Sequence, residues 1–291
     1  MSSSAPIVVL DSGLGGLTVV RAMLKALPGE QIVYFGDTAR LPYGTKSAGT
    51  VATFVSQIIS YLLPLSPKHV VIACNTATAL ALPATRCAYP GLPISGVIEP
   101  GAKAAVAAAG SKHQPIIGVI ATEATVRSKA YIHAIHRRRQ MARLVQQATP
   151  LLAPMVEEGR RSDDPLVLLA LKQYIGPLLA VPIDVLVLGC THYPLLKDAV
   201  IATVGPNVSV IDSAEQCAQD VAHRLRARKL TADVHTQMVL PPRCFVTDDA
   251  PRFGKLAERF LGMSLPVPVW VPPEELYRDH RAGPPRMSIP A

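Results

Sequence analysis

Aromatic and charged residues are both scarce in this sequence of 291 residues. Only 5% of the residues are Phe, Trp or Tyr and only 17% are charged, whereas 49% are hydrophobic. A chain with this much apolar material to bury does not have the composition of a disordered protein. Its length suffices for one large domain or two smaller ones with a substantial core.

Paired cysteines are also missing. The five cysteines, at positions 74, 87, 190, 217 and 244, are odd in number and include no C-x-x-C pair. This pattern argues against a disulfide framework and against a structural zinc site. We therefore expect reduced thiols, no bound metal and a cytoplasmic location.

Targeting and membrane-spanning segments are not apparent in the sequence. Residues 1–6 are short and uncharged and lead straight into an apolar strand, unlike a signal peptide. The apolar stretch at residues 177–190 is interrupted by Pro182 and Asp184, and no run looks long enough to span a bilayer. No membrane partner is expected.

Negative charge is in the minority, and the formal net charge is +8. Such a balance suits nucleic acid, an anionic surface or an anionic small substrate. The densest basic run, residues 137–139 followed by Arg143, lies in a polar stretch without interleaved aromatic residues. A solvated helix face explains it better than a nucleic-acid site, so no nucleic-acid partner is expected.

Short apolar runs alternate with stretches of helical periodicity. Runs rich in Val, Ile and Leu, typical of buried parallel strands, occupy residues 7–10, 32–35, 70–73, 116–120, 185–188 and 208–211. Helices are predicted at residues 16–27, 50–63, 100–109, 128–147 and 214–228. The alternation predicts an α/β protein with mainly parallel sheets.

A weak internal echo suggests two similar α/β halves that face each other. Residues 70–76 resemble residues 185–191, because both are buried strands that end in a cysteine. Residues 7–12 and 116–122 likewise look like two first strands. Beyond residue 263 the chain is rich in proline, which predicts an extended tail over residues 263–291, with Trp270 as an anchor to the body.

The first candidate site is the glycine-rich segment 11–16, which follows a strand and opens a helix. Its glycines allow a close approach to an anion, although a plain tight turn explains them equally well. A dinucleotide fingerprint is the rival, but Thr18 stands where its third glycine belongs. Asp37, at the end of the next strand, leaves the dinucleotide-binding interpretation possible.

Two cysteines each stand between a strand end and a helix start. Cys74 is followed by Asn75 and Thr76, and Cys190 by Thr191 and His192. A helix N-terminus lowers a thiol pKa, and the neighbouring polar groups can cap the helix or bind a carboxylate. Taken singly, each cysteine is better explained as a small buried hydrophobe.

The loop at residues 36–44, which contains Tyr43 and Gly44, is either a plain connector or a segment that closes over a substrate. Two thiols in equivalent places favour a catalytic role over a structural one, because racemisation needs an acid/base on each side of one carbon. Asp11 can assist one cysteine and His192 the other. No lysine stands in an obvious position to form a Schiff base with a cofactor. The closest candidate, Lys46, lies in a loop.

Taken together and in this order, the motifs resemble the glutamate racemase family of the aspartate/glutamate racemase superfamily. The matching segments are 11–19, 36–40, 42–44, 74–77 and 189–194, with a further likeness at 150–159. The resemblance covers about residues 6–262. It implies two similar three-layer domains with the active site in the cleft between them, the first formed by residues 1–98 and 208–262 and the second, inserted, by residues 99–207.

The resemblance also implies interconversion of L- and D-glutamate without a cofactor, which supplies D-glutamate for peptidoglycan. Cys74 would act on the α-proton of the D-enantiomer and Cys190 on that of the L-enantiomer. The supporting polar residues would be Asp11, Glu157 and His192, and the substrate would be bound by Asp11, Ser12, Tyr43, Gly44, Asn75, Thr76, Thr191 and His192.

Three alternatives stay open from the sequence. Aspartate racemase uses the same two-cysteine logic on a substrate one methylene shorter. A non-catalytic protein could bind a partner through its basic surface. A nucleotide-binding oxidoreductase is disfavoured by Thr18. Assembly as a homodimer is also open.

Overall fold

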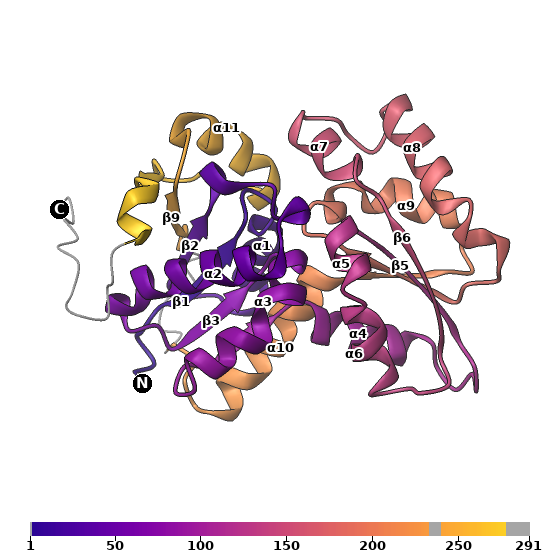
Figure 1. The fold of residues 1–291 in the computed structure, drawn as a ribbon, viewed down its shortest axis with the longest axis horizontal. Coiled ribbons are helices and arrows are strands. Elements are labelled where there is room, and N and C mark those ends of the chain that lie inside the picture. Colours follow the sequence, from indigo (N-terminus) through magenta and orange to yellow (C-terminus); the bar gives the residue numbers. More distant parts are fainter. Residues whose placement is uncertain (1, 233–239, 278–291) are drawn as a thin grey trace.

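The computed structural model describes residues 2–232 and 240–277, and the chain forms two lobes, each built on its own sheet (Figure 1). One sheet has six strands in the order β10-β9-β2-β1-β3-β4, and the other has four in the order β6-β5-β7-β8. Every strand pair is parallel. The predicted α/β class with mainly parallel sheets is confirmed.

The strands are short and, apart from those at the sheet edges, apolar. They are β1 (Ile7–Asp11), β2 (Ile32–Gly36), β3 (His69–Ile72), β4 (Ile94–Gly96), β5 (Ile116–Ala121), β6 (Arg143–Ala148), β7 (Val185–Gly189), β8 (Ser209–Asp212), β9 (Arg243–Val246) and β10 (Val269–Trp270). The central strands β1 and β7 are buried along their whole length, as strands covered by helices on both faces should be.

Helices follow most strands and cover both faces of the sheets. The α-helices are α1 (Leu17–Ala26), α2 (Ala48–Leu62), α3 (Asn75–Ala88), α4 (Ile98–Ala108), α5 (Glu123–Arg127), α6 (Ala130–His136), α7 (Leu152–Glu157), α8 (Pro165–Ile175), α9 (Lys197–Val204), α10 (Ser213–Ala227) and α11 (Ala250–Leu261). Short 3₁₀ turns are η1 (Thr38–Arg40), η2 (Tyr43–Thr45), η3 (Leu63–Leu65), η4 (Leu178–Ala180), η5 (Tyr193–Leu196) and η6 (Pro273–Tyr277).

The two halves repeat one strand order. In the first sheet β1 lies between β2 and β3, with β4 beyond β3, and in the second β5 lies between β6 and β7, with β8 beyond β7. Cys74 follows β3 and Cys190 follows β7. The internal echo predicted from the sequence therefore corresponds to topologically equivalent strands, and the two cysteines stand at equivalent places.

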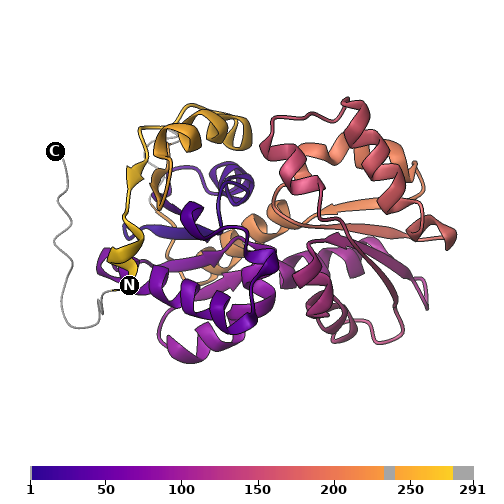
Figure 2. The ribbon, with the colours of Figure 1, turned by 45° about the horizontal axis from the view of Figure 1, so that its top comes forward.

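Alternate side chains of β1 build the two faces of the first sheet. Val8 and Leu10 belong to the apolar cluster that includes Val51 and Val55 of α2. Ile7 and Val9 belong to a larger cluster that includes α1 and continues into the second sheet. Helices thus flank each sheet in three layers (Figure 2), and a continuous core joins the two lobes on one side.

One predicted helix is wrong. The basic stretch at residues 128–147 was expected to be a single helix, but α6 ends at His136 and the chain then forms β6, an edge strand paired with β5. Residues 137–139 fall in the turn between them, where Arg137 and Arg138 pair with Glu99. An edge strand tolerates polar residues. Because β6 contains Gln146 and Gln147, its sequence lacks the apolar run by which the buried strands were predicted.

The strand at residues 208–211 was assigned to the first domain, and this placement is also wrong. As β8 it pairs with β7, Val187 opposite Ile211, and so completes the second sheet. The chain returns to the first lobe only afterwards, through α10, which packs on α1. The reason is that β8 occupies the place equivalent to β4, which the second half needs to complete its sheet.

The proline-rich segment after residue 263 is more ordered than predicted as far as the structure describes it. Val269 and Trp270 pair with β9, and Val271 and Leu276 are buried. The Trp270 indole donates a hydrogen bond to the Thr247 carbonyl oxygen at 3.2 Å, so its role as an anchor is confirmed. Residues 278–291, the remainder of the expected tail, lie outside the described residues.

One helical stretch meets the length and hydropathy of a membrane span, contrary to the expectation from the sequence. It is Ala48–Leu65, with a mean hydropathy of 1.4. The stripe formed by Val51, Val55, Ile58 and Ile59 is nevertheless buried against the first sheet. A core helix passes the same test, so length and composition alone give little support for a membrane span.

Candidate active site

A cavity lies where the carboxyl ends of the central strands of both sheets meet. Its volume is about 200 Å³. Ser12 reaches it from the end of β1, Cys74 from the end of β3, Thr122 from β5 and Cys190 from β7. In parallel α/β sheets, ligands bind outside these strand ends, and here two such ends face one space.

Ten of the eleven site residues predicted from the sequence line this cavity. They are Ser12, Tyr43, Gly44, Cys74, Asn75, Thr76, Glu157, Cys190, Thr191 and His192. The eleventh, Asp11, lies just behind the wall and is 1% exposed. The sequence thus identified a set of residues that the fold brings together from both lobes.

Several lining residues were not predicted. Thr122 and Glu123 follow β5, and Pro150, Ala153 and Pro154 surround the start of α7. A signal for Thr122 was present, because it follows the first strand of the second half as Ser12 follows that of the first. The α7 residues lie in segment 150–159, whose likeness to the family singled out only Glu157, and no local pattern places the others at the cavity.

Cys74 stands at the N-cap of α3, where its sulfur accepts a hydrogen bond from the Ala77 backbone N–H at 3.4 Å. Its sulfur also lies 3.7 Å from the Ser12 hydroxyl. Burial, and then the negative charge of Asp11, raise the pKa of the Cys74 thiol to about 12. Cys74 is therefore held as the neutral thiol, the form that donates a proton.

Asp11 is a buried carboxylate with one free oxygen. Its Oδ2 accepts a hydrogen bond from the Gly13 backbone N–H at 2.9 Å, whereas Oδ1 has no partner among the described residues. Burial raises its pKa, and the opposing positive charge of His192 lowers it. A buried acceptor without a partner is costly, so this oxygen is suited to a cation or donor that arrives with a ligand.

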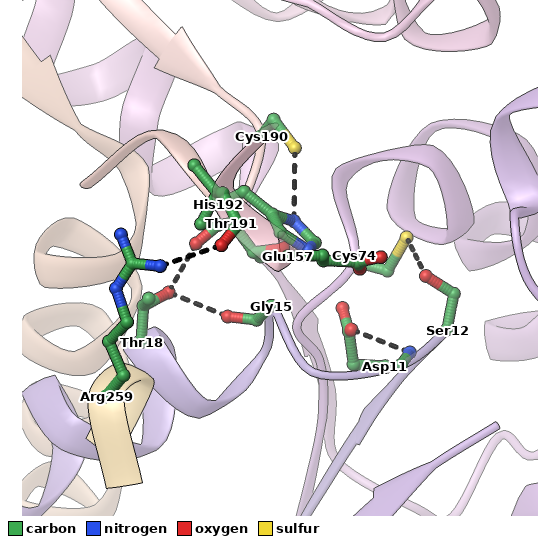
Figure 3. A network of polar contacts seen from close by, with 12 residues as sticks. Asp11, Ser12, Gly15, Thr18, Cys74, Glu157, Cys190, Thr191, His192 and Arg259 are labelled. Carbon is green, nitrogen blue, oxygen red and sulfur yellow. Dashed lines mark hydrogen bonds and ion pairs between the residues drawn. The ribbon is translucent and has the colours of Figure 1, made fainter. Parts of the chain in front are cut away.

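On the other side, three side chains form a chain of polar contacts (Figure 3). The Cys190 sulfur lies 3.7 Å from His192 Nδ1, and His192 Nε2 lies 2.9 Å from Glu157 Oε1. Burial lowers the pKa of His192, but its contacts with Cys190 and Glu157 raise it more, to about 10. These contacts favour the protonated ring, which can exchange a proton with the Cys190 sulfur.

Hydroxyl and amide groups occupy the floor of the cavity. The Thr76 and Thr122 hydroxyls are 2.9 Å apart, and each also contacts Thr125, at 3.4 and 3.0 Å. Asn75 accepts a hydrogen bond from Tyr131 through Oδ1, while its buried Nδ2 has no partner among the described residues. A donor left free at the start of α3 is suited to a carboxylate group.

The first turn of α1 holds the Cys190 segment in place. The Thr18 hydroxyl donates to the backbone carbonyl oxygens of Thr191 at 2.8 Å and of Gly15 at 2.9 Å. Position 18, where a dinucleotide fingerprint would require glycine, therefore carries a hydroxyl that links the two lobes.

Asp37 is engaged within the fold rather than facing a ligand. Its carboxylate accepts hydrogen bonds from Arg40 at 2.8 Å, from Thr247 at 3.1 Å and from the Tyr43 hydroxyl. Fully buried, it fixes the loop that brings Tyr43 and Gly44 to the cavity. Asp37 was the residue that left a nucleotide-binding site possible from the sequence. In the structure its carboxylate supports the cavity wall instead.

Two parallel sheets, with a cavity between their carboxyl ends that is lined by two thiols, define a two-lobed α/β enzyme. A family model described as Asp/Glu/Hydantoin racemase matches residues 7–221. The glutamate racemase of Syntrophus aciditrophicus (strain SB) is 46% identical over 263 residues, which cover 90% of this chain and 94% of the relative.

Solved structures agree. The glutamate racemase isoform RacE1 from Bacillus anthracis superposes with a TM-score of 0.86 at 38% identity, covering 92% of this chain and 98% of that one. The glutamate racemase from Francisella tularensis subsp. tularensis SCHU S4, solved in complex with D-glutamate, gives 0.83 at 34% identity with the same coverage. This chain therefore belongs to the Asp/Glu/Hydantoin racemase family, and it is an isomerase.

Proposed function

We propose that this enzyme interconverts L- and D-glutamate without a cofactor, by proton transfer to and from two cysteines. The observation that carries the proposal is the placement of Cys74 and Cys190 after equivalent strands of the two sheets, where both line one cavity. Removal of a proton from one face of a carbon and its return to the other requires one acid/base on each side. The names of the relatives, and the D-glutamate complex of one of them, support glutamate as the substrate.

In the proposed reaction of L-glutamate, Cys190 as thiolate removes the α-proton and Cys74 as thiol donates one to the opposite face. Cys74 is prepared for the donor role because burial and Asp11 hold its pKa at about 12. The reverse reaction exchanges the roles. Each turnover leaves the proton on the other sulfur, so the enzyme must redistribute it before the same enantiomer reacts again.

His192 and Glu157 are the proposed assistants of Cys190. An imidazolium 3.7 Å from the sulfur can stabilise the thiolate, or return a proton to it, and the Glu157 carboxylate at 2.9 Å stabilises the positive ring. On the Cys74 face, the free Asp11 oxygen is suited to the substrate ammonium. That positive charge would also favour ionisation of Cys74 in the substrate complex.

Substrate binding is assigned to the polar groups that line the cavity. The free Asn75 amide and the Thr76 hydroxyl, at the N-terminus of α3, are suited to a carboxylate. Ser12, Tyr43, Gly44 and Thr191 complete the proposed contacts. The developing negative charge of the carbanion would be stabilised by these donors in a site shielded from water.

The biological role that follows is supply of D-glutamate for peptidoglycan. A cytoplasmic location belongs to the same proposal, because two-thiol chemistry requires reduced cysteines and all five are free. Neither statement affects the chemistry of the site.

The test is circular dichroism of the purified protein with L-glutamate and, separately, with L-aspartate, without added cofactor. The proposal expects the glutamate signal to decay to zero while aspartate is unchanged, with no sensitivity to agents that trap pyridoxal phosphate. Decay with aspartate alone would transfer the assignment to aspartate racemase. Decay with neither substrate would contradict racemisation of acidic amino acids.

A further inference from the structure

Helix α11 belongs to the first lobe but reaches the acid/base groups that come from the second. Its last turn carries two adjacent side chains, Arg259 and Phe260, that contact the segments bearing Glu157 and His192. Neither side chain lines the cavity, so neither can touch a substrate there. Their contacts nevertheless include the backbone beside Glu157 and the imidazole ring of His192.

Arg259 contacts the end of α7. Its Nη1 donates to the Val156 carbonyl oxygen at 2.9 Å, and its Nη2 donates to the Arg160 carbonyl oxygen. The Val156 carbonyl lies next to Glu157 in the last turn of α7 and also accepts from the Gly159 backbone N–H at 3.0 Å, and the Arg160 carbonyl lies just beyond the helix. A cation is favoured at this C-terminal end. The guanidinium therefore fixes the backbone from which Glu157 projects; Figure 3 shows Arg259 beside this network.

Phe260 contacts the other partner directly. Its ring meets the His192 imidazole edge to face, with centroids 5.4 Å apart and an interplanar angle of 88°. Phe260 is 1% exposed, so this contact is well packed. Such a packing limits rotation of the imidazole, whose two nitrogens must address Cys190 and Glu157 at once.

The orientation of His192 matters because its contact with Cys190 is long. At 3.7 Å, a small displacement of the ring would remove the proton path, and misplacement by about 1 Å can reduce a rate by about a hundredfold. The titratable groups that face His192 are Cys190, Glu157 and Asp11. None of these groups belongs to α11, which acts on the pair through the hydrogen bonds of Arg259 to the α7 backbone and the packing of Phe260 on the imidazole ring.

We propose that Arg259 and Phe260 are positioning residues that hold the Glu157–His192 pair in line with Cys190. Helix α11 of one lobe thereby completes the acid/base machinery of the other. The proposal rests on the proposed function for the role of Cys190, but the geometric claim concerns His192 itself and can be tested without turnover.

The test compares Arg259→Met and Phe260→Leu with matched controls on the same helix, Arg252→Met and Phe253→Leu. Arg252 is exposed, and Phe253 is as buried as Phe260 but packs against Tyr34. The His192 pKa is followed by NMR of ¹⁵N-labelled histidine, with the signal assigned by a His192→Gln variant. Racemisation is measured as kcat/KM across pH, and folding by thermal melts.

We expect Arg259→Met and Phe260→Leu each to lower the pKa of His192 by about one unit, because its contacts with Cys190 and Glu157 loosen. Loss of the Arg259 charge alone would raise this pKa, so a fall reports the loosened contacts. We expect kcat/KM to fall by about ten- to a hundredfold, and Arg259→Lys to restore part of the loss. Both controls should leave the His192 pKa unchanged. A merely structural role of Arg259 and Phe260 would lower the melting temperature of their two variants without this selective shift.

An unchanged His192 pKa in both folded variants would overturn the proposal, and so would an equal shift in the matched controls. If the wild-type protein fails to racemise glutamate, the proposed function is lost, whereas the NMR titration still decides whether α11 positions His192.

Discussion

Gly15 and Thr191 lie in direct contact across the boundary between the lobes. A Cβ atom at position 15 would stand 2.2 Å from the Thr191 hydroxyl oxygen and 2.6 Å from the His192 ring. Real Cβ atoms do not approach so closely, so the segment after Cys190 fits against α1 only because residue 15 lacks a side chain. The glycine-rich turn, which resembled an anion-binding loop in the sequence, is needed here for close packing.

The variant Gly15→Ala should therefore displace Thr191 and His192. We expect a loss of about 1–3 kcal/mol in the free energy of unfolding and a larger relative loss of racemisation, because the overpacking falls on the Cys190 segment. Urea unfolding and kcat/KM measure the two effects. Gly49→Ala in α2, where an added Cβ meets nothing within 4 Å, is the control; it should keep kcat/KM and lose no stability, since alanine suits a helix better than glycine. Equal behaviour of the two variants would contradict this assignment.

Replacement of either cavity cysteine should abolish racemisation. We expect Cys74→Ala and Cys190→Ala each to lower kcat/KM for both enantiomers by at least about a hundredfold, since each removes one general acid/base. Circular dichroism with L- and D-glutamate measures the loss, and thermal melts report folding. Cys87→Ala, at an exposed position on α3, should be fully active. Near-wild-type turnover by either cavity variant would sink the two-base scheme.

Loss of the Glu157 charge should change how stability depends on pH. The folded-state pKa of His192, about 10, is above the ordinary value of 6.5. Its protonation therefore stabilises the fold fully below pH 6.5, and this contribution is lost as pH rises through 10. Glu157→Gln removes a cause of the raised pKa, so its free energy of unfolding should fall less than that of the wild type between these pH values.

Urea unfolding at pH 6.5 and pH 10 measures that difference for wild type, Glu157→Gln and His192→Gln. Other titrating groups are common to all three proteins and cancel in the comparison. Parallel losses in the three proteins would show that His192 does not carry the effect.

Asp11 should control the reactivity of Cys74. Its negative charge is the second cause, after burial, of the raised Cys74 pKa. Asp11→Asn keeps an acceptor for the Gly13 N–H but removes the charge, so the thiolate fraction of Cys74 at pH 9 should rise. Alkylation by iodoacetamide, followed at the Cys74 peptide by mass spectrometry, should be faster in the variant, with the exposed Cys87 as internal reference. A slower or unchanged rate would contradict the electrostatic coupling.

The central strands, and the strand ends that carry the two cysteines, could be predicted because their signals are local, whereas the roles of the cavity residues came from the family resemblance. Each central strand is a continuous apolar run, and the polar residue that follows it is placed at the cavity by parallel topology alone. The edge strands could not be found in this way. Gln146 and Gln147 of β6 need no apolar partner at a sheet edge, and β10 is only two residues long.

Support for the cavity was invisible in the sequence because it depends on tertiary contacts. Glu157 reaches His192 across 35 positions, and Phe260 reaches the same ring from a helix near the end of the described chain. Neither the periodicity of the sequence nor the spacing of its motifs predicts such long-range contacts. The family resemblance pointed to Glu157, but nothing in the sequence pointed to Arg259 or Phe260.

The short strand β10 has a consequence for how the protein behaves outside its site. It covers β9, which would otherwise present unpaired backbone N–H and C=O groups along the open margin of the first sheet. A chain cut after residue 262 would keep every cavity residue but bare that margin, beside the apolar Phe245 and Val246. Unpaired strand edges pair readily with strands of other molecules, so such a chain should associate with itself more readily than one that keeps β10.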